Sequence, residues 1–213
     1  MRSSRLLGLL ALSLVAIPPL AAQKPSPRLG VLAGLNLAKL TGDQVDPFDD
    51  TRTGFLAGAF GEFNLSNAVA IEPQVLYAQK GGKGSDEGVD VTFKLDYIEV
   101  PLLLKYTFGA VDAGARPHLY LGPAIAFKMS CKFAGESEGV GLDFDCEDFS
   151  DFGEIKSTDF GGIVGAGVNI RDFLLGVRYE LGFTKIAESV DTGTEDIKNS
   201  TISLYLGYAF RLK

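Results

Sequence analysis

Residues 201–212 read Thr-Ile-Ser-Leu-Tyr-Leu-Gly-Tyr-Ala-Phe-Arg-Leu, and this stretch decides the fold. Every second residue from Ile202 to Leu212 is apolar or aromatic, whereas the intervening positions mix small, polar and charged side chains. Successive side chains of a β-strand point to opposite faces, so this alternation predicts a strand with one apolar face. The same pattern recurs at 117–129 and 173–184. We therefore expect an all-β chain.

The connections between such segments alternate between long and short. Arg171 and Asp172 form the shortest connection, and 130–157 is the longest. An antiparallel meander with long loops at one end and tight turns at the other is typical of outer-membrane barrels. We predict an eight-stranded antiparallel up-and-down transmembrane β-barrel, with strands at 29–39, 53–63, 68–80, 92–108, 117–129, 158–170, 173–184 and 200–213.

Charge placement indicates which face of the predicted strands points outward. The strand charges share a face with most of the strand glycines, and small or charged side chains fit a narrow lumen better than Phe and Tyr do. The alternative is a soluble exported barrel of the lipocalin type that binds a small apolar ligand, because alternation alone does not distinguish inside from outside. We predict a lumen charge network that consists of Glu62, Glu72, Glu99, Lys105, Lys128, Arg178, Glu180 and Arg211.

Three prolines lie inside the predicted strands. Pro73, Pro101 and Pro123 each remove one hydrogen-bond donor, and a closed barrel has no edge strand to accommodate that loss. We therefore expect β-bulges at these positions.

The first 22 residues indicate the compartment. Arg2 and Arg5 precede an apolar run from Leu6 to Ile17, and Ala21 and Ala22 then offer a cleavage site. This order is typical of a secretory signal peptide, and twelve apolar residues are too few to span a bilayer. The sequence predicts a signal peptide at 1–22 and a mature barrel domain at 23–213, with the exact cleavage site open by a residue or two.

Composition excludes two classes of protein. After residue 22 no apolar run approaches the roughly 18 residues of a membrane-spanning helix, which excludes helical membrane proteins. The formal charge is −7, with no Lys/Arg cluster, so nucleic acid is not an expected partner. The expected partners are outer-membrane lipid, the barrel-insertion machinery and an extracellular ligand of the long loops.

Residues Tyr97–Tyr106 read Tyr-Ile-Glu-Val-Pro-Leu-Leu-Leu-Lys-Tyr, and this block resembles a stretch of the outer-membrane protein β-barrel domain family, often labelled "porin family". Gly54–Phe63 and Ile71–Gly81 are similar to the second and third strands of that family. The resemblance implies an eight-stranded barrel in the outer membrane of a Gram-negative-type bacterium, with Pro73 and Pro101 as family features and without catalytic residues. One departure is the C-terminus, where such barrels commonly end on an aromatic residue.

No pattern of catalytic, cofactor-binding or metal-ligating residues stands out. The only histidine, His118, follows a short turn, and metalloprotease, serine-hydrolase and phosphate-loop motifs are absent from the sequence. The acidic stretch 143–154 has Asp148 where an EF-hand requires Gly, which leaves a solvated acidic loop or a weak divalent-cation site. We expect no enzymatic activity, no cofactor and no dedicated metal site.

The only two cysteines lie at 131 and 146. A hairpin with Glu138 and Gly139 at its tip places Cys131 opposite Cys146 and Phe133 opposite Phe144. Opposed residues of an antiparallel pair are close enough for a disulfide, and an exported protein meets oxidising conditions. We predict a Cys131–Cys146 disulfide.

Taken together, the sequence predicts an integral outer-membrane β-barrel without enzymatic activity. Its expected role is structural, adhesive or that of a narrow pore, with the long loops as the contact surface.

Overall fold

A computed structural model of the chain describes residues 26–42, 50–86, 89–137, 140–146, 156–185 and 197–211. The predicted signal peptide, the hairpin tip at Glu138 and Gly139, and most of the acidic loop lie outside these ranges. In the part of the chain that the structure describes, no helix is long and apolar enough to cross a membrane.

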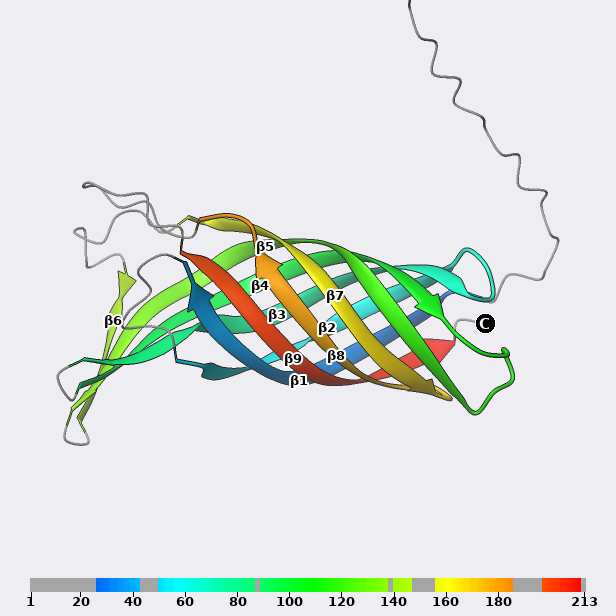
Figure 1. The fold of residues 1–213 in the computed structure, drawn as a ribbon, viewed down its shortest axis with the longest axis horizontal. Helices are drawn as coiled ribbons and strands as arrows, with labels where there is room; N and C mark the ends of the chain where they lie inside the picture. Colours follow the sequence, from blue (N-terminus) through cyan, green and yellow to red (C-terminus); the bar gives the residue numbers. More distant parts are fainter. Residues whose placement is uncertain are drawn as a thin grey trace, which may run out of the picture.

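The structure is built from antiparallel strands, eight of which form a closed ring (Figure 1). Pairing of β1 with β9 and of β4 with β5 completes the ring, and β6 pairs only with β5. The predicted eight-stranded barrel is therefore confirmed, with one additional strand outside it. The strands are β1 (Arg28–Thr41), β2 (Arg52–Asn64), β3 (Val69–Asp86), β4 (Val89–Thr107), β5 (Ala115–Ser137), β6 (Val140–Asp145), β7 (Thr158–Ile170), β8 (Phe173–Gly182) and β9 (Lys198–Arg211).

Short turns gather at one end of the barrel, which we call the short-turn end. Arg171 has a positive φ of 57° in the two-residue turn between β7 and β8, as tight hairpins require. The Ser66 hydroxyl accepts hydrogen bonds from the Ala68 and Val69 amides at 3.2 and 3.0 Å and shapes the turn before β3. The first and last strands also meet here, since Arg28 lies opposite Arg211. The opposite end, where β6 stands, is the loop end.

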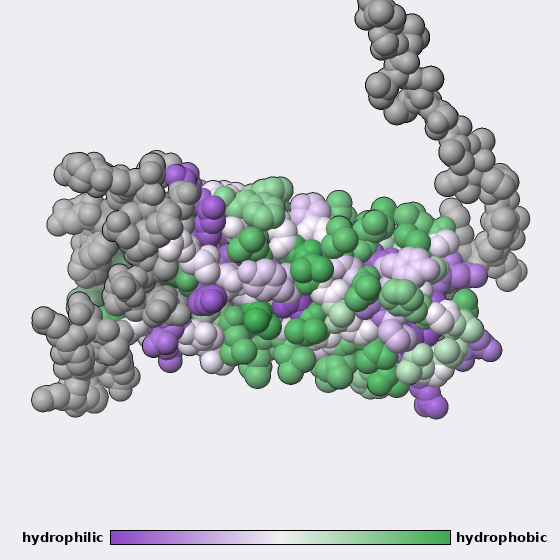
Figure 2. Space-filling model, viewed as in Figure 1, coloured by the Kyte–Doolittle hydropathy of each residue, from purple (hydrophilic) through white to green (hydrophobic). Residues whose placement is uncertain are grey.

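The two faces of each strand differ as the sequence predicts. On β9, Leu204 is 57% exposed and its neighbour Ser203 only 1%. Apolar residues gather along the barrel wall, and hydrophilic residues gather toward its two ends (Figure 2). The outward face is thus the apolar one, which contradicts the alternative of a soluble barrel with an apolar interior.

The prediction of β-bulges at the three prolines is wrong. The same register holds on both sides of Pro73, of Pro101 and of Pro123, although the ladders skip a few pairs beside them. A proline lacks its N–H but keeps a φ compatible with a strand, so the ladder loses bonds without an inserted residue. Among the registers of the described strands, the shift lies elsewhere, between Asp96 and Tyr97.

That shift explains why the predicted strand ends at residue 129, whereas β5 continues to Ser137. Met129 is the additional residue opposite the Asp96–Tyr97 step, because Lys128 pairs with Tyr97 and Ser130 with Asp96. Before the bulge the even-numbered side chains of β5 face inward, and after it the odd-numbered ones do, beginning with Cys131. One extra residue reverses the faces, so a reading in strict period two stops there.

Candidate functional site

The lumen holds an ion-pair cluster near the short-turn end. The Arg28 guanidinium donates three hydrogen bonds of 2.8 to 3.0 Å to Glu62 on the neighbouring strand β2. The Lys105 ammonium lies 2.8 Å from Glu62 Oε2 and 2.9 Å from Glu72 Oε2. Two cations thus balance two carboxylates that are almost removed from solvent.

A second cluster lies farther toward the loop end. The Lys80 ammonium is 2.8 Å from Glu99 Oε2 and 2.5 Å from Glu180 Oε1, with side-chain exposures of 1% for Lys80 and 0% for Glu99. Arg178 lies 3.8 Å from Glu99 Oε1 and donates a hydrogen bond of 3.2 Å to Gln74. Buried charges without such partners would cost several kcal/mol each.

Gln74 joins the two clusters. Its amide nitrogen donates to Glu72 Oε1 at 2.8 Å, while its carbonyl oxygen accepts from Arg178. The hydrogen bonds and ion pairs therefore run from the short-turn end into the middle of the barrel. We call this set the lumen network; its members are Arg28, Glu62, Glu72, Gln74, Lys80, Glu99, Lys105, Arg178 and Glu180.

Buried apolar side chains occupy the lumen beside the network. The largest of these apolar side chains are Tyr120 and Tyr205. They belong to one buried cluster with Leu32, Phe60, Leu76, Leu103, Ile163 and Leu174. A Cβ on Gly165 would collide with the Tyr120 ring, and one on Gly176 with the Tyr205 ring. The glycines on the inward face thus make room for aromatic rings, and side chains fill the barrel interior.

The structure brings six of the eight predicted network residues together: Glu62, Glu72, Glu99, Lys105, Arg178 and Glu180. Lys128 is half-buried opposite Tyr97, just before the bulge. The side chain of Arg211 lies outside the described residues.

Sequence reasoning missed three members of the network: Lys80, Gln74 and Arg28. A signal for the first two was present, because counting in steps of two from Glu72 along β3 reaches Gln74 and then Lys80 on the same face. Arg28 lies one residue before the predicted start of its strand.

His118 lies in the lumen near the short-turn end and is buried. Its ring centroid is 5.9 Å from that of Tyr120, and a Cβ on Gly167 would lie 2.7 Å from its Nε2. Packing against a ring and a glycine suits a structural residue. The described residues contain no group of three or more His, Cys, Asp or Glu that could hold a metal ion.

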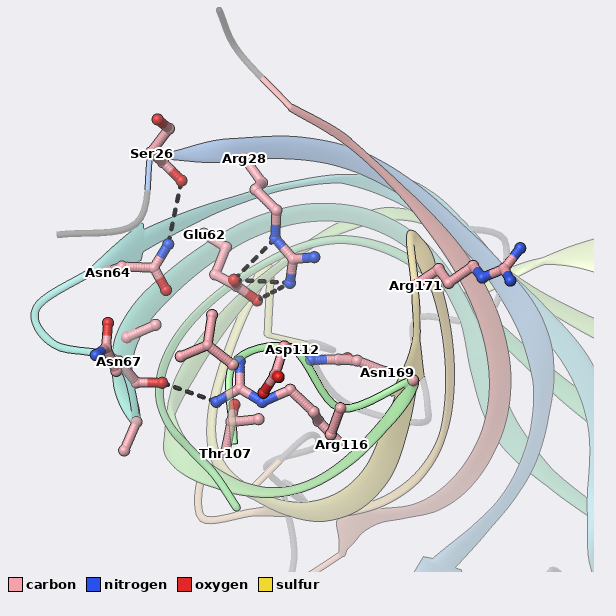
Figure 3. Close-up of a pocket in the computed structure, with 15 residues that line it drawn as sticks. Ser26, Arg28, Glu62, Asn64, Asn67, Thr107, Asp112, Arg116, Asn169 and Arg171 are labelled. Atoms are coloured by element: carbon pink, nitrogen blue, oxygen red, sulfur yellow. Dashed lines mark hydrogen bonds and ion pairs between the residues drawn. The ribbon is translucent and has the colours of Figure 1, made fainter. Parts of the chain in front are cut away.

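A polar cavity of about 780 Å³ opens at the short-turn mouth (Figure 3). Arg28 and Glu62 face each other in it, and Arg116 donates a hydrogen bond of 2.8 Å to the Asn67 carbonyl. Asp112, from the turn after β4, lies near Arg116 in this view. The cavity thus ends on the first ion pairs of the lumen network.

At the loop end, β4, β5 and β6 continue past the barrel wall. We call residues 89–96, 130–137 and 140–145 the loop-end sheet. The hairpin has the predicted register, with Phe133 opposite Phe144, and the predicted disulfide between Cys131 and Cys146 is present, with Cα atoms 5.5 Å apart. On one face the disulfide packs with Phe93, Leu95 and Phe133, and the Phe93 and Phe133 rings lie 4.8 Å apart.

The other face of the loop-end sheet carries exposed ion pairs. Lys94 lies 3.0 Å from Asp143, and Lys132 lies 3.9 Å from Asp145. Pairs this exposed contribute little stability. They make the outer face hydrophilic while the disulfide and the aromatic residues fix the sheet.

A protein-family model described as "Outer membrane protein beta-barrel domain" matches residues 21–188. A search of curated proteins found no match. Among solved structures, the chain is similar to Ail, the attachment invasion locus protein of Yersinia pestis, with 17% identity over 87% of this chain and 99% of that one, and a TM-score of 0.45. It is also similar to Neisserial surface protein A, with 14% identity, coverages of 85% and 97%, and a TM-score of 0.46.

Proposed function

The chain belongs to the outer membrane protein β-barrel domain family and lies in the outer membrane of a Gram-negative-type bacterium; on that premise we propose that it is a closed, non-enzymatic barrel that displays the loop-end sheet as a contact surface. The observation that carries this proposal is the contrast between a lumen filled by side chains and a loop-end sheet that projects from the barrel and is held by a disulfide and an aromatic contact. A structural or adhesive role thus takes precedence over a narrow pore.

The filled lumen argues against conduction. A permeating ion would have to separate Lys80 from Glu99 and Glu180, which are held at 2.8 and 2.5 Å. The neighbouring positions are filled by Tyr120 and Tyr205. Eight strands enclose only enough space for such side chains.

The construction of the loop-end sheet supports a contact role. A disulfide closes the hairpin of β5 and β6, and the tilted contact between the Phe93 and Phe133 rings joins β4 to it. A surface that is ordered before binding loses less conformational entropy when a partner docks. The proposed partner is an extracellular ligand.

Attachment of whole cells tests this proposal. Cells of a Gram-negative host that display the full chain would be compared with vector-only cells on surfaces coated with collagen, fibronectin or heparin–albumin. We expect severalfold more attachment to at least one coating, and loss of that gain when Gly-Gly-Ser replaces residues 132–145.

The Val111→Lys variant, changed in an exposed turn at the opposite end, is the matched control and should attach like the unmodified chain. Heat-modifiable mobility on SDS gels would verify that each variant has a folded barrel. Equal attachment with and without the hairpin, or no gain on any coating, would refute the contact role.

Two further parts of the proposal concern export. We propose cleavage of the signal peptide near Ala22, which N-terminal sequencing of the membrane-inserted protein would test. Membrane insertion would use the host's barrel-insertion machinery, and depletion of that machinery should leave the chain unfolded in the periplasm.

A further inference from the structure

The polar cavity at the short-turn mouth contains more hydrogen-bonding groups than its own side chains satisfy. Its volume of about 780 Å³ lies within the range of small-ligand sites, about 300 to 1,000 Å³. Part of its lining is small and apolar and consists of Ala68, Ala70, Ala113 and Gly114. The short turns of outer-membrane barrels face the periplasm. The cavity is therefore on the periplasmic side, at the opposite end from the loop-end sheet.

Asn169 and Arg116 form one wall of the cavity, because they lie opposite each other on β7 and β5. Asn169 is only 7% exposed, its side-chain oxygen has no hydrogen-bond partner among the described residues, and its amide points into the cavity (Figure 3). The Arg116 guanidinium donates to the Asn67 carbonyl, but its buried Nε has no partner in the described part of the chain. Buried polar groups without partners are costly, so this wall suits a ligand that supplies the missing hydrogen bonds.

Arg28 adds a donor on the opposite wall. Its Nε and Nη2 donate to Glu62, which leaves Nη1 without a partner among the described residues. Arg28 and Arg116 approach the cavity from opposite sides (Figure 3). Donors from β1, β5 and β7 thus surround one space. Guanidinium groups match the planar geometry of a carboxylate, so a carboxylate is the acceptor that these donors suit best.

Asp112 places an acceptor beside these donors. It lies in the turn between β4 and β5, where the Phe108 amide donates to the Pro117 carbonyl at 2.8 Å and closes the turn. The Asp112 side chain lies near Arg116 in the cavity (Figure 3), and its carboxylate has no hydrogen-bond or ion-pair partner among the described residues. The cavity can therefore receive a group that carries a carboxylate and an N–H donor close together.

We propose that this cavity binds the C-terminal residue of a peptide in the periplasm, with the carboxylate against Arg116 and Asn169 and the peptide N–H toward Asp112. Arg28 offers the carboxylate a further donor. A C-terminal residue carries its carboxylate and its N–H on one carbon atom, which matches donors and an acceptor in one cavity. A phosphate dianion is a poorer occupant, because Asp112 and Glu62 line the same space and would repel it. The site is independent of the contact role of the loop-end sheet.

Isothermal titration calorimetry of the chain, purified from outer membranes in a neutral detergent, tests the site. The probe is N-acetyl-D-alanyl-D-alanine, and its C-terminal amide is the matched control because it lacks only the charge. We expect one saturable site for the acid, at least tenfold weaker binding of the amide, and no displacement by an equal concentration of inorganic phosphate. Equal binding of acid and amide, displacement by phosphate, or no binding of the acid would overturn the proposal.

Variants separate a specific site from general attraction to arginines. Asn169→Asp keeps the size of the side chain but places a negative charge against the peptide carboxylate, so it should abolish binding. Arg116→Gln should weaken binding by at least tenfold. Arg171→Gln is the matched control, because Arg171 lines the same mouth but its guanidinium points away from the cavity (Figure 3); it should bind like the unmodified chain.

Heat-modifiable mobility would establish that each variant is folded. Binding of the acid by folded Asn169→Asp and Arg116→Gln at the affinity of the unmodified chain, or equal losses in all three variants, would refute the site.

Co-sedimentation with purified peptidoglycan sacculi distinguishes the two sources of such a peptide. Pelleting of the chain that excess N-acetyl-D-alanyl-D-alanine reverses would support peptides of the cell wall as the ligand. A chain that stays in the supernatant but binds the soluble probe would support free peptides.

Discussion

The lumen and the loop-end sheet both contain lysine–carboxylate ion pairs, but the pairs are buried in the lumen and exposed on the sheet. Lys80 and Glu99 lie 2.8 Å apart inside the barrel and are almost fully buried. Lys94 and Asp143 lie 3.0 Å apart on the loop-end sheet, with 35% and 54% of their side chains exposed. The distances are nearly equal, so the comparison isolates burial. We infer that the buried pairs determine barrel stability and closure, whereas the exposed pairs mainly give the sheet a hydrophilic surface.

Glu99→Ala should have the largest effect. The substitution leaves Lys80 with one carboxylate and Arg178 without its ion pair, and breaking a buried pair costs about 3 to 5 kcal/mol. Urea unfolding of the barrel in lipid vesicles measures the change in free energy. Glu99→Gln, which keeps the shape and a hydrogen-bonding oxygen, should be milder. A loss below about 1 kcal/mol for Glu99→Ala would remove the distinction between the two regions.

A charge on the outer wall should cost somewhat less. Leu204→Lys places an ammonium on the exposed apolar face of β9, where a cation near the bilayer midplane costs about 2 to 4 kcal/mol. The same vesicle unfolding measurement applies. Val111→Lys, in the exposed turn after β4, should change stability by less than about 0.5 kcal/mol. Equal effects of the two lysines would contradict the orientation of the wall.

Loss of the disulfide should act locally. Closing the loop between Cys131 and Cys146 contributes about 3 kcal/mol in the chain-entropy model, but to the loop-end sheet rather than to the ring. Replacing both cysteines by serine should increase protease cleavage between residues 130 and 157 and leave heat-modifiable mobility intact. Recovery of both cysteines alkylated without prior reduction would show that the bond does not form.

The exposed pair should have the smallest effect. Lys94→Ala and Asp143→Ala should each change the free energy of unfolding by about 0 to 1 kcal/mol, and salt should reduce even that. A double-mutant cycle would measure the coupling between the two side chains. A coupling above about 2 kcal/mol would mean that exposure does not decide what these pairs contribute.

Alternation and charge placement made most of the ring predictable. Strand β8 keeps strict period two from end to end and β9 does so from Thr201 to Phe210, because each has one face in lipid and one in the lumen. The hairpin register followed from aligning two cysteines and two phenylalanines at once. Six network residues could be predicted because a charged side chain in a barrel strand lies in the lumen and not on the lipid-facing side.

The bulge, the length of β3 and the ion-pair partners could not be predicted, because the alternation of apolar and polar residues does not determine them. Met129 reverses the faces of β5, and no residue type marks that position in advance. Lys80 was on the right face but near the end of its predicted strand, where the structure continues β3 to Asp86. The pairing of Lys105 with both Glu62 and Glu72 needs the stagger between strands, which is a property of the closed ring.

Conductance is the most direct test of the closed lumen. Single copies of the folded protein would be inserted into a planar bilayer and recorded at constant voltage in 1 M KCl. Because the lumen network and the tyrosine rings fill the interior, we predict little or no steady current. Large, long-lived open channels would contradict the filled lumen and restore the pore as the function of this barrel.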